Sequence, residues 1–175
     1  MNTKETSILI VDDDDDIRMF MATLLSQSLK IEHACKTAAS AQEAMSLLES
    51  SFFHLVLTDI QMSGISGVQL CEHINENYPY TVVIMLSGMS EIEYAIASMR
   101  AGAFDYILKP IRLPKLIESI ERALKYQDVL MTKHYCEQSL EEEIHDLISL
   151  NKRLRTALKP PARVTEKSLA KTQKR

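Results

Sequence analysis

Tryptophan is absent from this 175-residue sequence, and the aromatic residues together make up only 6% of it. The hydrophobic core must therefore consist mostly of aliphatic side chains. No run of apolar residues approaches the roughly 18 to 20 that a membrane-spanning helix needs. The apolar run 8–11 near the N-terminus is too short for a signal peptide, and five aspartates follow it directly. We therefore expect a cytoplasmic protein with no membrane insertion.

Cysteine is scarce as well. The three cysteines, Cys35, Cys71 and Cys136, are odd in number and widely spaced, with no CxxC pair and no metal-ligand spacing. Reduced, structural thiols are the expected state in a cytosolic protein, so the sequence indicates no disulfide framework.

Charge of both signs is present but unevenly distributed. Residues 1–110 contain six Lys and Arg against fifteen Asp and Glu, a net charge of −9, whereas residues 111–175 contain fourteen against nine, a net charge of +5. Residues 159–175 are basic, rich in Pro, Lys and Thr, and we expect them to be disordered. This tail is suited to nucleic acid, to another anionic partner or to no contact at all. The sequence contains no recognised DNA-binding domain.

Short apolar runs alternate with helical patterns along the first 120 residues. The runs are continuous in hydrophobicity, which is typical of parallel strands covered on both faces. The alternation predicts an α/β fold, a doubly wound five-stranded parallel sheet with helices on both faces. The expected strands are 7–11, 30–35 (a weaker edge strand), 54–58, 81–87 and 103–108, and the apolar helix faces lie within 17–25, 41–48, 68–74, 92–99 and 113–120.

Polar residues of an unusual kind end four of these strands. Because ligand chemistry in open parallel sheets lies outside the carboxyl ends of the strands, we expect these residues to converge on one pocket. They are Asp12 and Asp13 after the first strand, Asp59 after the third, Ser87 and Gly88 after the fourth, and Lys109 and Pro110 after the fifth.

This set of residues suits phosphoryl chemistry. Clustered carboxylates repel one another, and a hard cation such as Mg²⁺, which prefers carboxylate, carbonyl, water and phosphate oxygens, relieves that repulsion. Asp59 is then free to act as a nucleophile and to form an aspartyl phosphate. Lys109 and the cation would neutralise the charge that develops on the phosphoryl oxygens, and Ser87 could donate a hydrogen bond to them.

Four motifs carry a family resemblance. ILIVDD at 8–13, LTDIQMSGISG at 57–67, MLSG at 85–88 and AGAFDYILKP at 101–110 occur in this order and at typical separations. Together they resemble the receiver domain of bacterial two-component response regulators, of the chemotaxis-regulator type, over roughly residues 5–128. The resemblance implies a flavodoxin-like strand order 2-1-3-4-5 and phosphorylation by a sensor histidine kinase or a phosphotransfer protein.

The resemblance also implies a role for each matching residue. Asp13 would bind Mg²⁺ directly and Asp12 through water, with Asp59 and the backbone carbonyl of Gln61 as further ligands. Asp59 would be the phosphoacceptor, and Lys109 would pair with the phosphoryl group. The Lys109–Pro110 bond is expected to be cis.

Two further residues match the switch of the family. Ser87 stands at the switch hydroxyl position and Tyr106 at the aromatic switch position, although a strand tyrosine can also serve packing alone. Gln61 and Met89 lie where the family tunes phosphoryl lifetime.

The sequence departs from the family at a few positions. Ser63 stands where the family usually has proline, which should loosen the loop behind Asp59, and Asp14 and Asp15 replace a common Glu-Pro. Gly64 and Gly67 are expected to serve turn geometry.

The C-terminal part predicts one long helix, from Leu113 to about Leu158, ended by two prolines. Residues Leu140, Ile144, Leu147, Asn151, Leu154 and Leu158 follow coiled-coil spacing. Asn151 then occupies an a position, which commonly fixes register and favours a parallel dimer. The alternative is an amphipathic helix that packs on its own domain. The expected organisation is a receiver domain at 1–128, a helical extension at 129–158 and the tail at 159–175.

Three functions are compatible with these features. The first is a receiver that switches partner binding or dimerisation through its fourth helix, fifth strand and fifth helix, with no enzymatic activity beyond its own phosphotransfer and dephosphorylation. The second is a Mg²⁺-dependent phosphohydrolase, which Gln61 opposes because such enzymes usually carry an acid two residues after the nucleophile. The third is a constitutive dimerisation scaffold with a relic pocket. Separately, the lack of a recognised output domain is also compatible with a piece of a longer protein.

Overall fold

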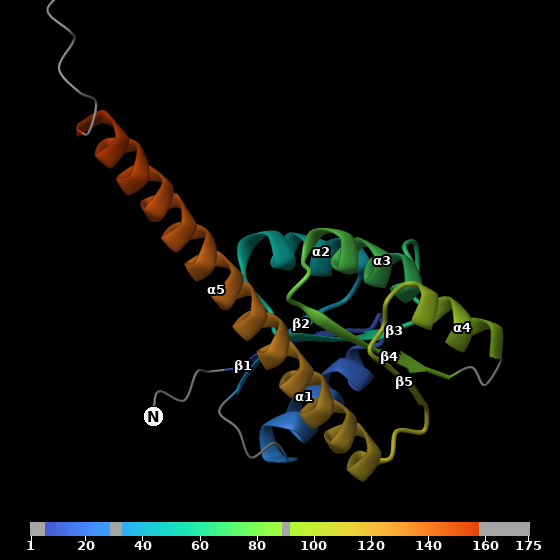
Figure 1. Ribbon diagram of the computed structural model, residues 1–175. Coiled ribbons are helices and arrows are strands. Elements are labelled where there is room, and N and C mark those ends of the chain that lie inside the picture. Colours follow the sequence, from blue (N-terminus) through green and yellow to red (C-terminus); the bar gives the residue numbers. More distant parts are fainter. Residues whose placement is uncertain (1–5, 29–32, 89–91, 158–175) are drawn as a thin grey trace, which may run out of the picture. The chain divides into compact units, whose positions relative to one another are not determined.

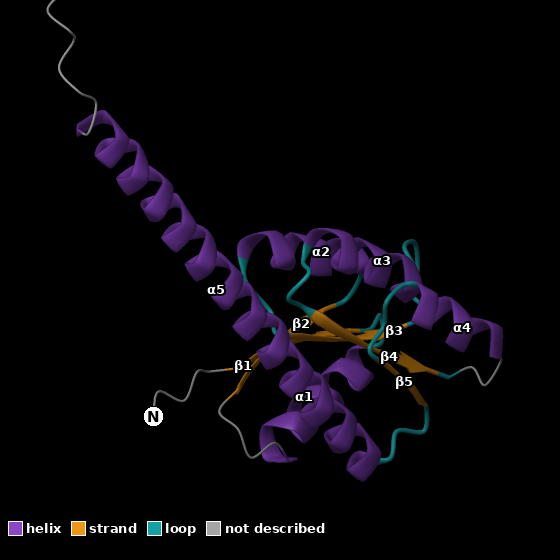
Figure 2. Cartoon of the chain, viewed as in Figure 1, coloured by secondary structure: helices purple, strands orange, loops and turns teal. Residues whose placement is uncertain are grey.

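The structure is a computed structural model that describes residues 6–28, 33–88 and 92–157. Five strands form one sheet, and a helix follows each strand (Figure 1, Figure 2). The strands are β1 (Thr6–Val11), β2 (His33–Ala38), β3 (Leu55–Asp59), β4 (Val82–Ser87) and β5 (Asp105–Leu108). The helices are α1 (Asp15–Ser28), α2 (Ala41–Ser50), α3 (Gly67–Asn77), α4 (Ile92–Arg100) and α5 (Leu113–Ala157).

All neighbouring strands are parallel, in the order β2-β1-β3-β4-β5. The predicted fold class and strand order are therefore confirmed. Four strands begin later than predicted, β3 and β4 by one residue each and β2 and β5 by more. β2 begins at His33, and residues 30–32 lie outside the described residues. β5 begins at Asp105, although Phe104 already donates its backbone N–H to the carbonyl of Val83, at 2.7 Å.

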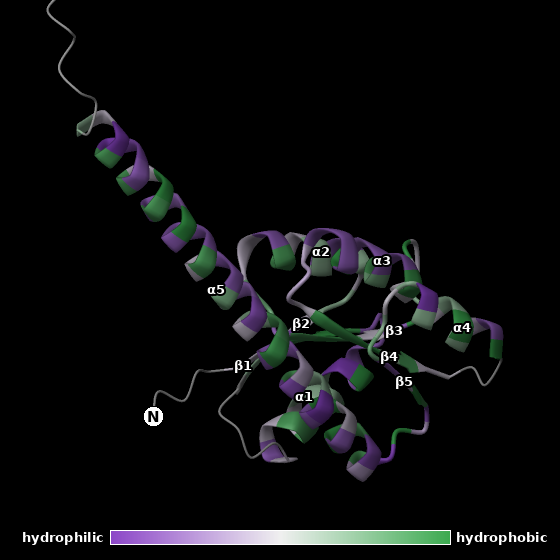
Figure 3. Ribbon diagram, in the orientation of Figure 1, coloured by the Kyte–Doolittle hydropathy of each residue, from purple (hydrophilic) through white to green (hydrophobic). Residues whose placement is uncertain are grey.

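The three inner strands β1, β3 and β4 are covered on both faces, which explains their continuous hydrophobicity (Figure 3). In β1, Ile8 and Ile10 belong to one core cluster and Leu9 and Val11 to the other. Successive side chains of a strand point to opposite faces, so two clusters require every position to be apolar. The sheet is thus held by two hydrophobic layers.

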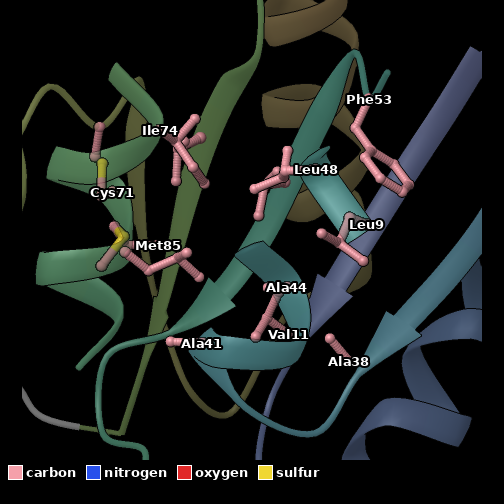
Figure 4. Packing of buried hydrophobic residues seen from close by; sticks show 14 of the residues in the cluster. Leu9, Val11, Ala38, Ala41, Ala44, Leu48, Phe53, Cys71, Ile74 and Met85 are labelled. Carbon is pink, nitrogen blue, oxygen red and sulfur yellow. The ribbon is translucent and has the colours of Figure 1, made fainter. Parts of the chain in front are cut away.

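Helices α2 and α3 provide most of the helical side of the first cluster (Figure 4). Leu48 of α2 and Ile74 of α3 lie over Leu9 and Met85 of the sheet, and Phe53 closes one end. The second cluster joins the sheet to α1 and to the first turns of α5. Its helical members are Met21, Leu25, Leu116, Ile120 and Ala123.

The chain divides into two units within α5, between Thr132 and Lys133. The helix itself continues from Leu113 to Ala157, so the predicted long helix is confirmed. The receiver boundary expected at residue 128 stays a prediction. Leu158 and the basic tail 159–175 lie outside the described residues. Of the helices described, none is both long and apolar enough to cross a membrane.

The two methionines of α1 provide a matched test of the packing. Met21 is completely buried, whereas Met19 is 71% exposed. Met21→Ala should lower the free energy of unfolding by about 2–4 kcal/mol, because the lost methylene contacts leave a cavity. Met19→Ala should change it by less than about 0.5 kcal/mol. Urea denaturation followed by circular dichroism measures both, and equal effects would contradict the assignment of the buried face.

The three thiols should differ in reactivity. Burial raises the pKa of the Cys35 thiol to about 11 and that of the Cys71 thiol to about 12, whereas Cys136 is exposed. A raised pKa keeps a thiol protonated, and the thiolate is the nucleophile. A thiol reagent at pH 8 should therefore modify only Cys136 quickly in the native protein, and all three cysteines in denaturant. Mass spectrometry identifies the site, and rapid modification of Cys71 in the native protein would contradict the fold.

Candidate functional site

Four strand ends meet at one edge of the sheet. Asp12 directly follows β1, Asp59 and Ser87 are the last residues of β3 and β4, and Lys109 directly follows β5. Because β1, β3, β4 and β5 are consecutive neighbours in the sheet, their carboxyl ends share that edge. The Lys109–Pro110 peptide bond is cis.

The ammonium group of Lys109 connects two of the carboxylates. Its Nζ lies 2.9 Å from Asp12 Oδ2 and 2.9 Å from Asp59 Oδ2. The side chains are largely removed from solvent, with 2% of Asp12, 13% of Asp59 and 20% of Lys109 exposed. Residues almost a hundred positions apart in the sequence thus form one charge-assisted hydrogen-bond group.

The same contacts act on the pKa of Lys109. Burial lowers this pKa, but the hydrogen bonds and negative charges of Asp59 and Asp12 raise it by more, so the pKa of Lys109 lies above its ordinary value. Lys109 is therefore an ammonium ion at neutral pH. A fixed positive charge beside Asp59 is suited to stabilise negative charge that develops on a group transferred to that carboxylate.

Backbone groups hold the other carboxylate oxygens. Asp59 Oδ1 accepts the N–H of Ile60 at 2.7 Å, and Asp12 Oδ1 accepts the N–H of Asp14 at 3.0 Å. The hydroxyl of Thr58 donates to the backbone carbonyl of Asp59 at 3.0 Å. Both acidic side chains are therefore fixed in orientation as well as in position.

Asp13 lies in a different environment, because it is exposed and its Oδ2 accepts the backbone N–H of Ser63 at 3.0 Å. A proline at position 63 would have no N–H to donate. The expected loosening of the loop is therefore offset, since Ser63 ties that loop to the turn after β1. Gln61, two residues after Asp59, is exposed in the same loop.

The chemistry of these residues fits a hard divalent cation. Asp12, Asp13 and Asp59 offer carboxylate oxygens, Gln61 offers a backbone carbonyl, and the three acids with Lys109 carry a net charge of −2. Within residues 6–28, 33–88 and 92–157, however, no three His, Cys, Asp or Glu side chains are grouped closely enough to hold a metal ion. In this structure Lys109 forms ion pairs with both Asp12 and Asp59, and these three side chains keep a net charge of −1.

The two expected switch residues lie on neighbouring strands. Ser87 is fully buried, and its carbonyl accepts the backbone N–H of Lys109 at 2.7 Å. Tyr106 is half-buried, pairs with Met85 across β4 and β5, and packs against the first core cluster. Both roles stay predictions. Met89, predicted to tune phosphoryl lifetime, lies outside the described residues.

Arg18 contributes to the site but was not identified from the sequence. Its guanidinium donates to the backbone carbonyl of Asp12 and forms an ion pair with Asp15 on the same turn of α1. Arg18 thereby anchors the turn that carries Asp12 and Asp13. The only signal in the sequence is an arginine three residues after an acid, which is common on helix surfaces.

Gly67 is required by a close approach rather than by a turn. A Cβ at this position would lie 1.9 Å from the carbonyl oxygen of Asp59, and the Gly67 N–H donates to the carbonyl of Ile60 at 3.0 Å. Gly64 does have the expected turn conformation, with φ of +85°. The first residue of α3 therefore lies in direct contact with the backbone of Asp59.

Comparison with known proteins gives a consistent result. Residues 8–121 match the family described as the response regulator receiver domain. The response regulator protein PilR of Pseudomonas aeruginosa is 35% identical over 120 residues, which are 69% of this chain and 26% of PilR. The chain thus matches only about a quarter of that relative's length.

Two solved structures match this chain over nearly the whole of their own length. A CheY-like receiver domain protein from Methanospirillum hungatei has a TM-score of 0.66 and 34% identity, covering 71% of this chain and 98% of that one. The response regulator TrrA from Thermotoga maritima was solved in complex with Mg²⁺-BeF. It has a TM-score of 0.61 and 28% identity, and the match covers 68% of this chain and 99% of TrrA.

Gly67→Ala tests the close approach to Asp59. The added methyl group cannot fit without moving the Asp59 backbone, so we expect a loss of at least about 2 kcal/mol in the free energy of unfolding. Gly88→Ala is the matched control, because among the described residues, its chain neighbours aside, no atom lies within 4 Å of a Cβ at this position. Denaturation in urea compares the two variants. If Gly67→Ala were as stable as Gly88→Ala, the described packing of α3 on β3 would be wrong.

Proposed function

The chain belongs to the response regulator receiver family, and from this premise we propose that Asp59 accepts a phosphoryl group from a sensor histidine kinase or a phosphotransfer protein. A receiver domain acts in two-component phosphorelay signalling and implies a histidine kinase partner. The observation that carries the assignment to Asp59 is the position of Lys109, whose Nζ is 2.9 Å from both Asp59 and Asp12.

The two oxygens of Asp59 have different roles in the proposed transfer. Oδ1 accepts the N–H of Ile60, and Oδ2 accepts a hydrogen bond from Lys109; Oδ2 is the proposed nucleophile because Lys109 can pass from it to the phosphoryl oxygens as the new bond forms. The new bond joins Oδ2 to phosphorus while the bond from phosphorus to the donor nitrogen breaks, and the leaving imidazole takes up a proton. Lys109 then pairs with the oxygens of the phosphoryl group.

Mg²⁺ is the proposed cofactor, held by Asp12, Asp13, Asp59 and the backbone carbonyl of Gln61. When bound, it supplies positive charge that neutralises the phosphoryl oxygens. In the described structure, Lys109 holds Asp12 Oδ2 and the Ser63 N–H holds Asp13 Oδ2. Both contacts compete for oxygens that a metal ion would use, so we expect them to weaken on metal binding.

Phosphorylation is proposed to change the surface formed by α4, β5 and the start of α5. Ser87 and Tyr106 would carry the change, since Ser87 ends β4 beside Asp59 and Tyr106 lies on the adjacent strand β5. The surface is suited to a partner because it exposes large apolar side chains. These are Ile92, Ile96, Met99 and Leu108, each between 43% and 68% exposed.

Polar contacts connect β5 to α5 within this surface. Ser119 donates to Asp105 Oδ2 at 2.6 Å, and Arg122 Nη1 lies 3.6 Å from the same oxygen. A shift of β5 would therefore act on α5, and we propose that the helical extension carries the signal to a dimer or a partner. Turnover of free phosphate esters is not favoured, because Gln61 is an amide at the position where a phosphohydrolase usually has an acid.

Incubation with Mg²⁺ and a small acyl phosphate should add one phosphoryl group to the protein, detected by intact mass and mapped to Asp59. Asp59→Asn should remove labelling, and chelation of Mg²⁺ should prevent it. Lys109→Met should slow labelling by on the order of a hundredfold, the usual effect of losing one such charge-stabilising group. Asp128→Asn, at an exposed acid of α5, is the control and should label normally.

Three results would contradict the proposal, and two of them would support an alternative. Equal labelling of the wild type and of Asp59→Asn would remove Asp59 from the mechanism. Steady phosphate release from phosphomonoesters would indicate a hydrolase. If light scattering and partner binding were the same with and without phosphorylation, the chain would be a constitutive scaffold.

A further inference from the structure

The second unit of the chain carries an exposed apolar stripe on α5. Six large apolar side chains lie between 47% and 65% exposed, interleaved with charged residues (Figure 3). They are Leu140, Ile144, Leu147, Ile148, Leu150 and Leu154. An apolar patch of this extent on a helix is typical of an interaction surface.

The stripe is wider than the seam of a simple parallel coiled coil. If Ile144 is an a position, Leu147 and Leu154 are d positions, but Ile148 and Leu150 fall on the flanking e and g positions, which usually carry charges. A parallel pair would set Ile148 beside Glu143 and Leu150 beside Arg155 of the other helix. Each of these flanking contacts would place an apolar side chain against a charge.

Charge is separated along the same stretch. Residues 137–146 contain five acids and no Lys or Arg, whereas residues 151–157 contain three basic residues and no acid. Two copies in parallel would align like charges, whereas two antiparallel copies would align opposite ones. Helix dipoles also attract each other in the antiparallel arrangement, so both the side-chain charges and the dipoles favour antiparallel pairing.

We propose that residues 140–157 pair with the same segment of a second copy of this chain in an antiparallel arrangement. In the register that aligns the seams, Ile144 packs on Leu154 of the other copy, and Leu147 packs beside Asn151. Flanking residues then match in kind: Ile148 lies beside Ile148, and Glu141 lies beside Arg155.

Asn151 is compatible with this arrangement. In a parallel dimer, asparagines at a positions face each other and satisfy one another. Here Asn151 Oδ1 already accepts a hydrogen bond from Nε of Arg155 on the same helix, at 3.0 Å. The guanidinium of Arg155 has four further N–H donors, which leaves it able to pair with a carboxylate of the other copy.

This inference rests on the proposed role of the helical extension in dimerisation, and it names the occupant and the orientation. It does not depend on phosphoryl transfer to Asp59, and its tests use the unphosphorylated full chain. A failure of labelling at Asp59 and a failure of pairing at α5 are therefore separate results.

Disulfide cross-linking distinguishes the two orientations. Ile144→Cys and Leu154→Cys are made separately in a Cys136→Ser background. The thiols of half-buried Cys35 and buried Cys71 have raised pKa values and should react slowly. Antiparallel pairing predicts that a mixture of the two variants forms a mixed disulfide. Each variant alone should stay uncross-linked, since identical positions lie about 15 Å apart along the helix, beyond the reach of a disulfide.

The opposite pattern would overturn the proposal. Efficient disulfides within each single variant would indicate a parallel dimer. Absence of any cross-link, with a monomer by sedimentation at every concentration, would mean that a different partner covers the stripe. Circular dichroism checks that each variant retains its helix.

A charge exchange provides a second, independent measurement. Glu141→Arg and Arg155→Glu should each weaken dimerisation on the order of tenfold, because two ion pairs per dimer become repulsive. The double variant should recover most of the affinity. Glu142→Arg changes the same charge on the outward face and should have little effect. If the double variant were no tighter than the single ones, the antiparallel register would be wrong.

Discussion

The ammonium group of Lys109 between Asp12 and Asp59 is the interaction on which the rest of the site depends. Two largely buried carboxylates at adjacent strand ends would repel each other, and the lysine at the end of β5 reduces this repulsion by forming an ion pair with both. This contact exists only when β1, β3 and β5 are all in place. The same positive charge that stabilises the folded strand ends is available to stabilise a phosphoryl group at Asp59.

Backbone packing gives this charged group its rigidity. Gly67 allows α3 to begin against the carbonyl of Asp59, and the N–H of Ile60 holds one oxygen of the Asp59 side chain. Arg18 holds the carbonyl of Asp12 from α1. Since α1 and α3 belong to opposite layers of the core, both hydrophobic clusters contribute to the position of the acidic residues. A change of packing on either face of the sheet would therefore move the acidic residues at the strand ends.

The two units of the chain have different chemistry. The receiver unit places an acidic, metal-compatible site at the edge of a sheet with two apolar layers. The second unit, from Lys133, places acidic residues and then basic ones along a helix that exposes a broad apolar stripe. We propose phosphoryl transfer for the first and antiparallel self-association for the second. The net charge of −9 over residues 1–110 belongs to the receiver unit, whereas the +5 over residues 111–175 comes from the basic tail 159–175.

The sequence by itself determined the α/β fold, the strand order implied by the family and the residues at the strand ends. Continuous apolar runs followed by Asp59, Ser87 or Lys109 are local patterns, and a parallel sheet brings its carboxyl ends together. Only the tertiary structure decided the contacts of Arg18, the close approach at Gly67 and the hydrogen bond from Ser63 to Asp13. Each of these contacts depends on the exact path of a turn or on backbone atoms from two segments that are far apart in the chain. The type of a side chain does not indicate where such backbone atoms lie. The same holds for Asn151, whose spacing suggests a parallel dimer while its Oδ1 accepts a hydrogen bond from Arg155 on the same helix.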